Sequence, residues 1–287
     1  PYLVLETLNE LSERLLMMNG LVAERGLPAH DLAHGLVDVL TDPFFMDQLE
    51  LQLVACRCLY NFLEINNDYV HSAVHAGAIE ALQSKLLEIS YIDLAEQSLQ
   101  TLEIISKISG TQIFRRNCLL SCLQYLDFFT IHAQRKAINI TANSVKYIKE
   151  SEFEIVEEIF PILQRIVVEF SDSQALNNSW LAISRIIKNF RSSPNLLTKL
   201  INRDLLNKMN SVISNPHTNI TTNLRLINTL SICARNDELS ILILKGGKVG
   251  DCIKSSLSKY KKSNNQDDSV SIEALMAAPK DLIISIL

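Results

Sequence analysis

The sequence is poor in aromatic residues and in glycine. Phe, Trp and Tyr make up 6% of the 287 residues, Trp occurs once, and none of the eight glycines lies between Gly110 and Gly246. Loops that bind phosphate groups are rich in glycine, so no such loop is expected between Gly110 and Gly246. The Gly-x-Ser-x-Gly and Gly-x-Gly-x-x-Gly turns of common enzyme folds are also missing. We therefore expect no catalytic residues and no cofactor in this chain.

The sequence also lacks the signals of a secreted or membrane protein. No signal peptide is visible, and no apolar run reaches the roughly 18 residues that a membrane span needs. The cysteines lie in apolar helical windows without the spacing of a disulfide framework, which predicts reduced, buried thiols: Cys56, Cys58, Cys118, Cys122, Cys233 and Cys252. We expect a cytoplasmic and nuclear protein that does not contact a membrane. The first residue is Pro1 rather than Met, which indicates a fragment of a longer chain.

What the chain has in abundance is a repeating pattern of Leu, Ile and Ala. Apolar residues recur at three- and four-residue spacings, as in Leu8, Leu11 and Leu15, which is typical of helices. Five similar stretches can be aligned, with spacings of 43, 39, 42 and 46 residues, at Asn61, Ile104, Asn143, Arg185 and Ser231. A period of about 40 to 47 residues is typical of armadillo and HEAT repeats. The sequence predicts an all-α, armadillo/HEAT-like right-handed helical solenoid of about six repeats.

The pattern also predicts the helix boundaries. Six long helices are expected at 3–19, 47–65, 91–108, 130–148, 172–190 and 217–235. Shorter helices are expected at 29–41, 69–75, 78–89, 111–126, 152–169, 195–213, 237–244 and 248–260. Helix starts or turns are expected at the prolines, among them Pro28, Pro161, Pro194 and Pro216. Trp180 stands at a packing position and should be buried.

Three segments follow from this organisation. Armadillo-like repeats are expected over 1–260. The polar span 261–269 has nothing to bury and predicts a flexible loop. Residues 270–287 would extend the solenoid with a last helix that starts near Pro279.

Two histidine pairs have the i, i+4 spacing of a zinc site. His30 and His34 flank Asp31, where zinc hydrolases of the His-Glu-x-x-His type carry Glu, and no third ligand is evident in the sequence. His71 and His75 repeat the spacing with no carboxylate between them. Because helix ends also favour Asp and His, we expect no metal at either pair.

Charge is distributed unevenly along the chain. Residues 1–50 contain nine acidic and two basic side chains, whereas residues 180–262 contain fourteen basic and four acidic ones. A basic end can bind nucleic acid through phosphate contacts. A solvated surface is the simpler interpretation, so nucleic-acid binding is kept as a third alternative.

The third helix of each repeat offers the candidate binding groove. In armadillo units this helix carries an Asn that holds the backbone of an extended partner, but only two of the five aligned positions are Asn here, Asn61 and Asn143. A regular Asn ladder for a basic peptide is therefore not expected. A folded partner held by a polar patch fits better, and the candidate residues are Arg57, Asn61, Glu96, Gln100, Glu103, Arg135, Asn139 and Asn143.

Two adjacent stretches carry a more specific resemblance. Asp93–Glu103 (DLAEQSLQTLE) and Tyr125–Asn143 (YLDFFTIHAQRKAINITAN) are similar to the armadillo region of the ubiquitin-fusion-degradation family of HECT-type E3 ubiquitin ligases, whose animal counterpart is the thyroid-receptor interactor. The resemblance implies a non-catalytic part of the ligase, because the family's thioester-forming cysteine lies in a C-terminal HECT domain.

The resemblance also implies partners. It points to ubiquitin or a ubiquitin-fused substrate, and to a ubiquitin-conjugating enzyme and the proteasome through the parent protein. The leading hypothesis is a substrate- and ubiquitin-recognition scaffold. The alternative is a karyopherin- or catenin-like adaptor that binds an extended peptide.

Overall fold

The computed structural model describes residues 1–18, 20, 26–245 and 277. These residues form helices joined by short turns, and no strand occurs among them, so the all-α prediction is confirmed. No helix in this part of the chain combines the length and the apolar character needed to cross a membrane. The predicted helix 248–260, the loop 261–269 and nearly all of the extension 270–287 lie outside the described residues.

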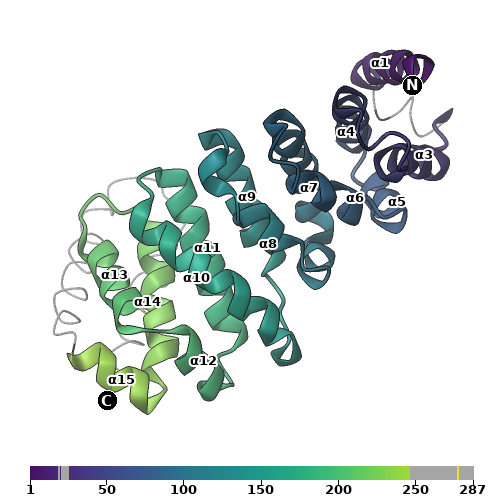
Figure 1. Ribbon diagram of the computed structural model, residues 1–287. Coiled ribbons are helices and arrows are strands. Elements are labelled where there is room, and N and C mark those ends of the chain that lie inside the picture. Colours follow the sequence, from purple (N-terminus) through teal and green to yellow (C-terminus); the bar gives the residue numbers. More distant parts are fainter. Residues whose placement is uncertain (19, 21–25, 246–276, 278–287) are drawn as a thin grey trace. The chain divides into compact units, whose positions relative to one another are not determined.

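The chain forms two compact units, Pro1–Val145 and Lys146–Leu287 (Figure 1). The helices of the first unit are α1 (Tyr2–Met17), α3 (Ala29–Thr41), α4 (Leu49–Ile65), α5 (Tyr69–His75), α6 (Ala78–Leu86), α7 (Ile92–Arg115), α8 (Cys118–Leu123) and α9 (Ile131–Ser144). Those of the second are α10 (Phe153–Glu169), α11 (Ser173–Asn189), α12 (Pro194–Leu200), α13 (Arg203–Ser214), α14 (Ile220–Ala234) and α15 (Asp237–Lys245). Short 3₁₀ turns, Leu126–Phe128 and Glu150–Glu152, precede α9 and α10.

The long third helices of successive repeats pack against one another. In the first unit α4 lies between α1 and α7, and α7 packs in turn on α9. In the second unit α11 packs on α14. The predicted helices at these places agree with α1, α4, α9, α11 and α14 to within four residues, and α3 and α5 agree with their predicted bounds.

Three local predictions are wrong. The helix predicted at 91–108 agrees with the structure up to a kink at Ser109 (φ −121°, ψ 32°), where two helices join to form α7, but the helix predicted at 111–126 is wrong, because α7 ends at Arg115 and the separate α8 follows. The helix predicted at 195–213 is two helices, α12 and α13. Pro161 lies inside α10 rather than at a helix start or in a turn. It is exposed, so the carbonyl that loses its amide partner can bond to water instead.

The kink in α7 brings its backbone close to the end of α9. A Cβ atom placed on Gly110 would lie 3.1 Å from both the carbonyl oxygen of Asn143 and the Cα atom of Ser144. Because these neighbours are backbone atoms, they cannot turn aside as a side chain would. Glycine at this position therefore sets how closely α7 and α9 approach.

The core between the helices is filled by aliphatic side chains and small residues. All five described cysteines are buried and free, which confirms the predicted thiols, and Cys252 lies outside the described part. Burial raises the pKa of Cys56, Cys58 and Cys233 to about 12. These thiols stay protonated at neutral pH and act as small apolar groups in the helix contacts.

Trp180 is 2% exposed, as predicted, and packs in the second unit. We expect Trp180→Ala to lower the free energy of unfolding by about 3–5 kcal/mol, because the lost indole leaves a cavity in the core. Chemical denaturation monitored by circular dichroism measures the change. Val168→Ala, which trims a side chain that is 58% exposed, is the control and should change little. An unaltered transition for Trp180→Ala would contradict the packing described here.

Candidate functional site

The eight candidate residues of the groove lie on three consecutive helices of the first unit. Arg57 and Asn61 are on α4. Glu96, Gln100 and Glu103 are on α7, and Arg135, Asn139 and Asn143 are on α9. We call the polar surface formed by these residues the third-helix surface. The structure therefore places the predicted patch on packed neighbours, where α4, α7 and α9 follow one another in Figure 1.

The three asparagines of this surface bind the neighbouring helix. Asn61 donates from Nδ2 to the hydroxyl oxygen of Ser12 on α1, at 3.0 Å. Asn139 and Asn143 donate to α7. The acceptors are the carboxylate of Glu103, at 2.7 Å, and the hydroxyl oxygen of Ser106, at 3.0 Å. Each asparagine is half-buried and fastens its helix to the preceding third helix.

The two carboxylates of the surface also have partners within the chain. Glu96 accepts hydrogen bonds from the backbone N–H (2.7 Å) and the hydroxyl (3.1 Å) of Thr130, the residue that caps α9. Glu103 accepts from Asn139 and from the ammonium group of Lys136, at 3.1 Å. Both carboxylates thus anchor α9 to α7.

Arg57 and Gln100 are the members of the patch that remain oriented toward solvent. The Arg57 side chain is exposed and that of Gln100 is half-buried, and neither forms a side-chain hydrogen bond with another described residue. Arg135 is half-buried and interacts within the chain. A crevice of about 270 Å³ lies beside Asn61 between α1 and α4. A partner of this surface would therefore meet Arg57 and Gln100 first.

The second unit has a groove that the sequence did not predict as a site. It measures about 670 Å³ and runs between α11 and α14. Four of its lining residues are cationic, and none of the described lining residues is acidic: the cations are Arg185, Lys188, Arg225 and Arg235. Burial lowers the pKa of Arg185 and Arg225, and the charge of Arg185 lowers that of Arg225 further. The sequence feature that could have indicated this groove is the excess of basic over acidic residues within 180–262.

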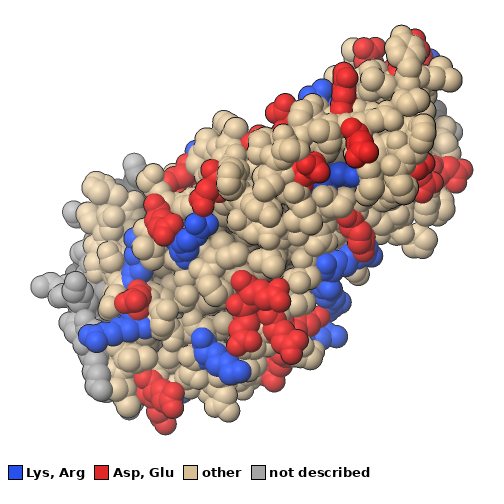
Figure 2. All heavy atoms as spheres, in the orientation of Figure 1, with Lys and Arg blue, Asp and Glu red and all other residues tan. Residues whose placement is uncertain are grey.

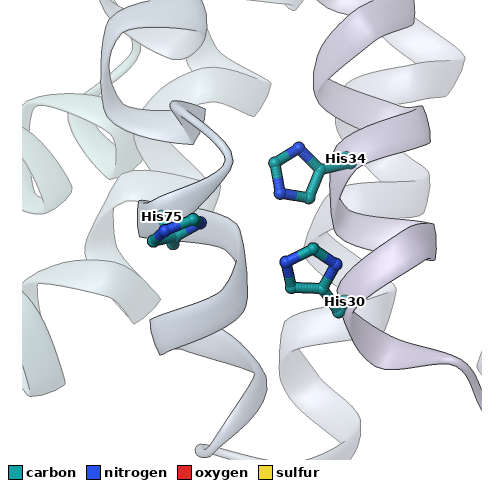
Figure 3. Close-up of side chains that lie close together, drawn as sticks. All are labelled: His30, His34 and His75. Carbon is teal, nitrogen blue, oxygen red and sulfur yellow. The ribbon is translucent and has the colours of Figure 1, made fainter.

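The structure supplies a third histidine next to the first predicted pair. His30 and His34 lie on α3 and face His75 at the end of α5 (Figure 3). One ligand atom from each of the three rings can be chosen so that all lie within 4.8 Å of one another. The sequence showed no third ligand for His30 and His34, but the fold brings His75 to this pair. Sequence spacing pairs His75 with His71, which is not part of this group, so spacing alone does not connect His75 to α3.

We expect Glu103→Ala to lower the free energy of unfolding by about 1–2 kcal/mol, because two charge-assisted contacts across the α7–α9 contact are lost. Urea denaturation at low ionic strength measures the change. Glu13→Ala removes an exposed carboxylate from α1 and serves as the matched control. Equal stability of the two variants would show that the contacts of Glu103 with Asn139 and Lys136 do not stabilise the chain.

The chain is similar in sequence to known ligases. It is 36% identical over all 287 residues to Ubiquitin fusion degradation protein 4 of Saccharomyces cerevisiae and spans 19% of that protein's length. It is 31% identical to E3 ubiquitin-protein ligase UPL3 of Arabidopsis thaliana, over 83% of the chain and 13% of the relative. Identity to E3 ubiquitin-protein ligase TRIP12 of Danio rerio is 37%, over 50% of the chain and 7% of the relative. No protein-family model matches the chain.

Solved structures show the same fold. A designed armadillo repeat protein in complex with the peptide (KR)4 aligns with a TM-score of 0.64 at 16% identity, covering 88% of this chain and 99% of the other. The structure of SYS-1 aligns with a TM-score of 0.64 at 12% identity, covering 90% of this chain and 49% of the other. The fold is an armadillo-repeat solenoid. Sequence and fold together place the chain in the armadillo-repeat region of the ubiquitin-fusion-degradation family of HECT-type E3 ubiquitin ligases.

Proposed function

We propose that this chain is a non-catalytic scaffold that recognises ubiquitin or a ubiquitin-fused substrate for a HECT-type E3 ligase. The observation that carries the proposal is the 36% identity, over the whole chain, to a protein named for ubiquitin fusion degradation. The parent protein would supply the catalytic cysteine and the contacts with a ubiquitin-conjugating enzyme and the proteasome. It would act in the cytoplasm and the nucleus.

The third-helix surface is the part of the scaffold that suits a folded partner. Its asparagines and carboxylates join α4 to α1 and α9 to α7, and α4 packs on α7, so the outward side chains lie on a rigid support. Rigid supports reduce the entropy that binding costs. Arg57 is exposed at the centre of α4, and arginine is over-represented among residues that dominate binding energy. We therefore assign the first contact to Arg57, together with Gln100 at the equivalent position of the next third helix.

The expected result is that Arg57→Ala combined with Gln100→Ala weakens binding of a ubiquitin chain at least about tenfold, which corresponds to roughly 1.4 kcal/mol. Isothermal titration calorimetry on the folded chain measures it, and the melting temperature should not change, because neither side chain holds a helix. Asn143 is not used, because its loss would also loosen the α7–α9 contact.

Arg203→Ala provides the control, since it removes an exposed arginine from α13 in the second unit. Wild-type affinity in the folded double variant would remove the third-helix surface from the proposal. Failure of the wild-type chain to bind either ubiquitin chains or a ubiquitin fusion would remove the recognition function itself.

The groove between α11 and α14 favours a second candidate function, binding of an extended peptide. Solenoids of this kind present extended surfaces that can bind peptides, and a designed armadillo repeat protein has been solved in complex with the peptide (KR)4. The four cations of the present groove, with no acidic residue among its described lining, would repel such a basic peptide. An acidic peptide would instead offset the mutual repulsion of Arg185 and Arg225.

We expect a Glu-rich peptide to bind the chain more tightly than a Lys-rich peptide of equal length, with an affinity that falls as salt is added. Arg225→Gln should weaken this binding about tenfold by fluorescence anisotropy, and Arg203→Gln should leave it unchanged. Tighter binding of duplex DNA than of the acidic peptide would assign the groove to nucleic acid. Equal binding of both peptides would show that the groove does not select peptides by their charge.

A further inference from the structure

The strongest feature outside these surfaces is the cluster of His30, His34 and His75. The ring centroids of His30 and His34 are 4.5 Å apart, and that of His75 is 6.0 Å from His30 and 5.9 Å from His34. The rings come from two helices, as Figure 3 shows. No other group of three or more His, Cys, Asp or Glu side chains with ligand atoms this close occurs among the described residues.

The two helices hold their histidines from a packed core. On α3, the turns that carry His30 and His34 are fixed by Ala33 and Val37, which are buried. On α5, Val70 and Ala73 are buried against the same core, and α3 packs directly on α5. Side chains borne by rigid helices keep their spacing, which is the condition for a preorganised ligand set.

One ring nitrogen of the cluster has no hydrogen-bond partner. The Nε2 atom of His34 is buried and unpaired among the residues that the structure describes. Buried polar nitrogens in folded proteins nearly always have a partner, so an unpaired one needs an explanation. A metal ion between the three rings would satisfy it.

The distances fit a tetrahedral ion. Zinc bound to imidazole nitrogens at 2.0–2.1 Å would place the nitrogens about 3.3 Å apart and the ring centroids about 5.2 Å apart. The observed centroid distances of 4.5, 5.9 and 6.0 Å lie on both sides of that value. The ligand atoms lie within 4.8 Å of one another, so rotations about the side-chain torsions would have to bring the nitrogens closer by up to about 1.5 Å.

The surroundings favour a cation. A carboxylate oxygen of Asp31 lies 3.5 Å from Nδ1 of His30, on the side where carboxylates commonly orient metal-binding histidines. In this position Asp31 leaves Nε2 of His30 available as the ligand. The N-terminal 50 residues carry nine acidic and two basic side chains, and on the face shown in Figure 2 acidic side chains predominate over α1 and α3.

We propose that His30, His34 and His75 bind one Zn²⁺ ion and leave its fourth position open. Three histidines without a thiolate form a donor set that zinc accepts readily. The ion would join α3 to α5 and so stabilise the first unit by an amount that depends on the free zinc concentration. Because His30 and His75 are exposed, the open position faces solvent, where water or a side chain of a bound partner could fill it.

The test is a zinc titration of the metal-free chain carrying Cys252→Ser, which removes the one cysteine outside the described residues as a competing ligand. A chromophoric chelator reports the affinity, and circular dichroism reports the melting temperature with and without zinc. We expect one equivalent of Zn²⁺ and a higher melting temperature in its presence. Substitution by Co²⁺ should give the absorption of a tetrahedral site without a thiolate charge-transfer band.

The variants separate the cluster from other binding. His34→Gln and His75→Gln, each checked for folding without metal, should weaken zinc binding about 100-fold or more. Asp31→Asn should weaken it about tenfold, as expected for loss of a group that orients a ligand. His71 lies one turn before His75 on α5, and the His71→Gln variant should bind zinc with the same affinity as the parent chain. Parental zinc affinity in both folded His34→Gln and His75→Gln would overturn the proposal, as would a thiolate band in the cobalt spectrum.

Discussion

The contact between each third helix and the third helix before it is the interaction on which the structure depends. Its hydrogen bonds join residues 33 to 50 positions apart, near the repeat length, as in Asn61 with Ser12 and Asn139 with Glu103. The second unit repeats the arrangement between α11 and α14, where the hydroxyl of Thr229 donates to that of Ser184 at 3.0 Å. Small buried residues let the helices approach, and these polar bonds then fix their register. Without that register the outward side chains would not form a common surface.

The same contact explains what the sequence could and could not predict. The bounds of α3 and α5 follow from local signals, because Pro28 precedes the first and Gly77 in the left-handed conformation follows the second. The break between the helices predicted at 91–108 and 111–126 coincides with the kink at Ser109, but the sequence could not predict the close approach of Gly110 to α9, because that approach depends on packing. The alignment of repeats placed Asn143 on the correct helix. It could not reveal that the amide binds Ser106, because that partner is chosen by packing.

The histidine cluster also shows what sequence spacing cannot predict. His34 and His75 are separated in sequence by the whole of α4, so the spacing rules that recognise metal sites on one helix cannot connect them. The packing of α3 on α5 brings them together. The first unit therefore carries two candidate sites: a polar surface on α4, α7 and α9, and a cluster of three histidines on α3 and α5. A partner bound at one need not touch the other, so the two can be tested separately.

The central claim is that the third helices present the recognition surface of a ligase scaffold. Hydrogen–deuterium exchange with and without a ubiquitin-fused substrate tests it most directly, because amide protection locates the contact without any substitution. The account predicts slower exchange along α4 and α7 on addition of the substrate, with α6 and α8 unaltered. Protection confined to α5, α6 or α8, with no change on α4 and α7, would contradict it.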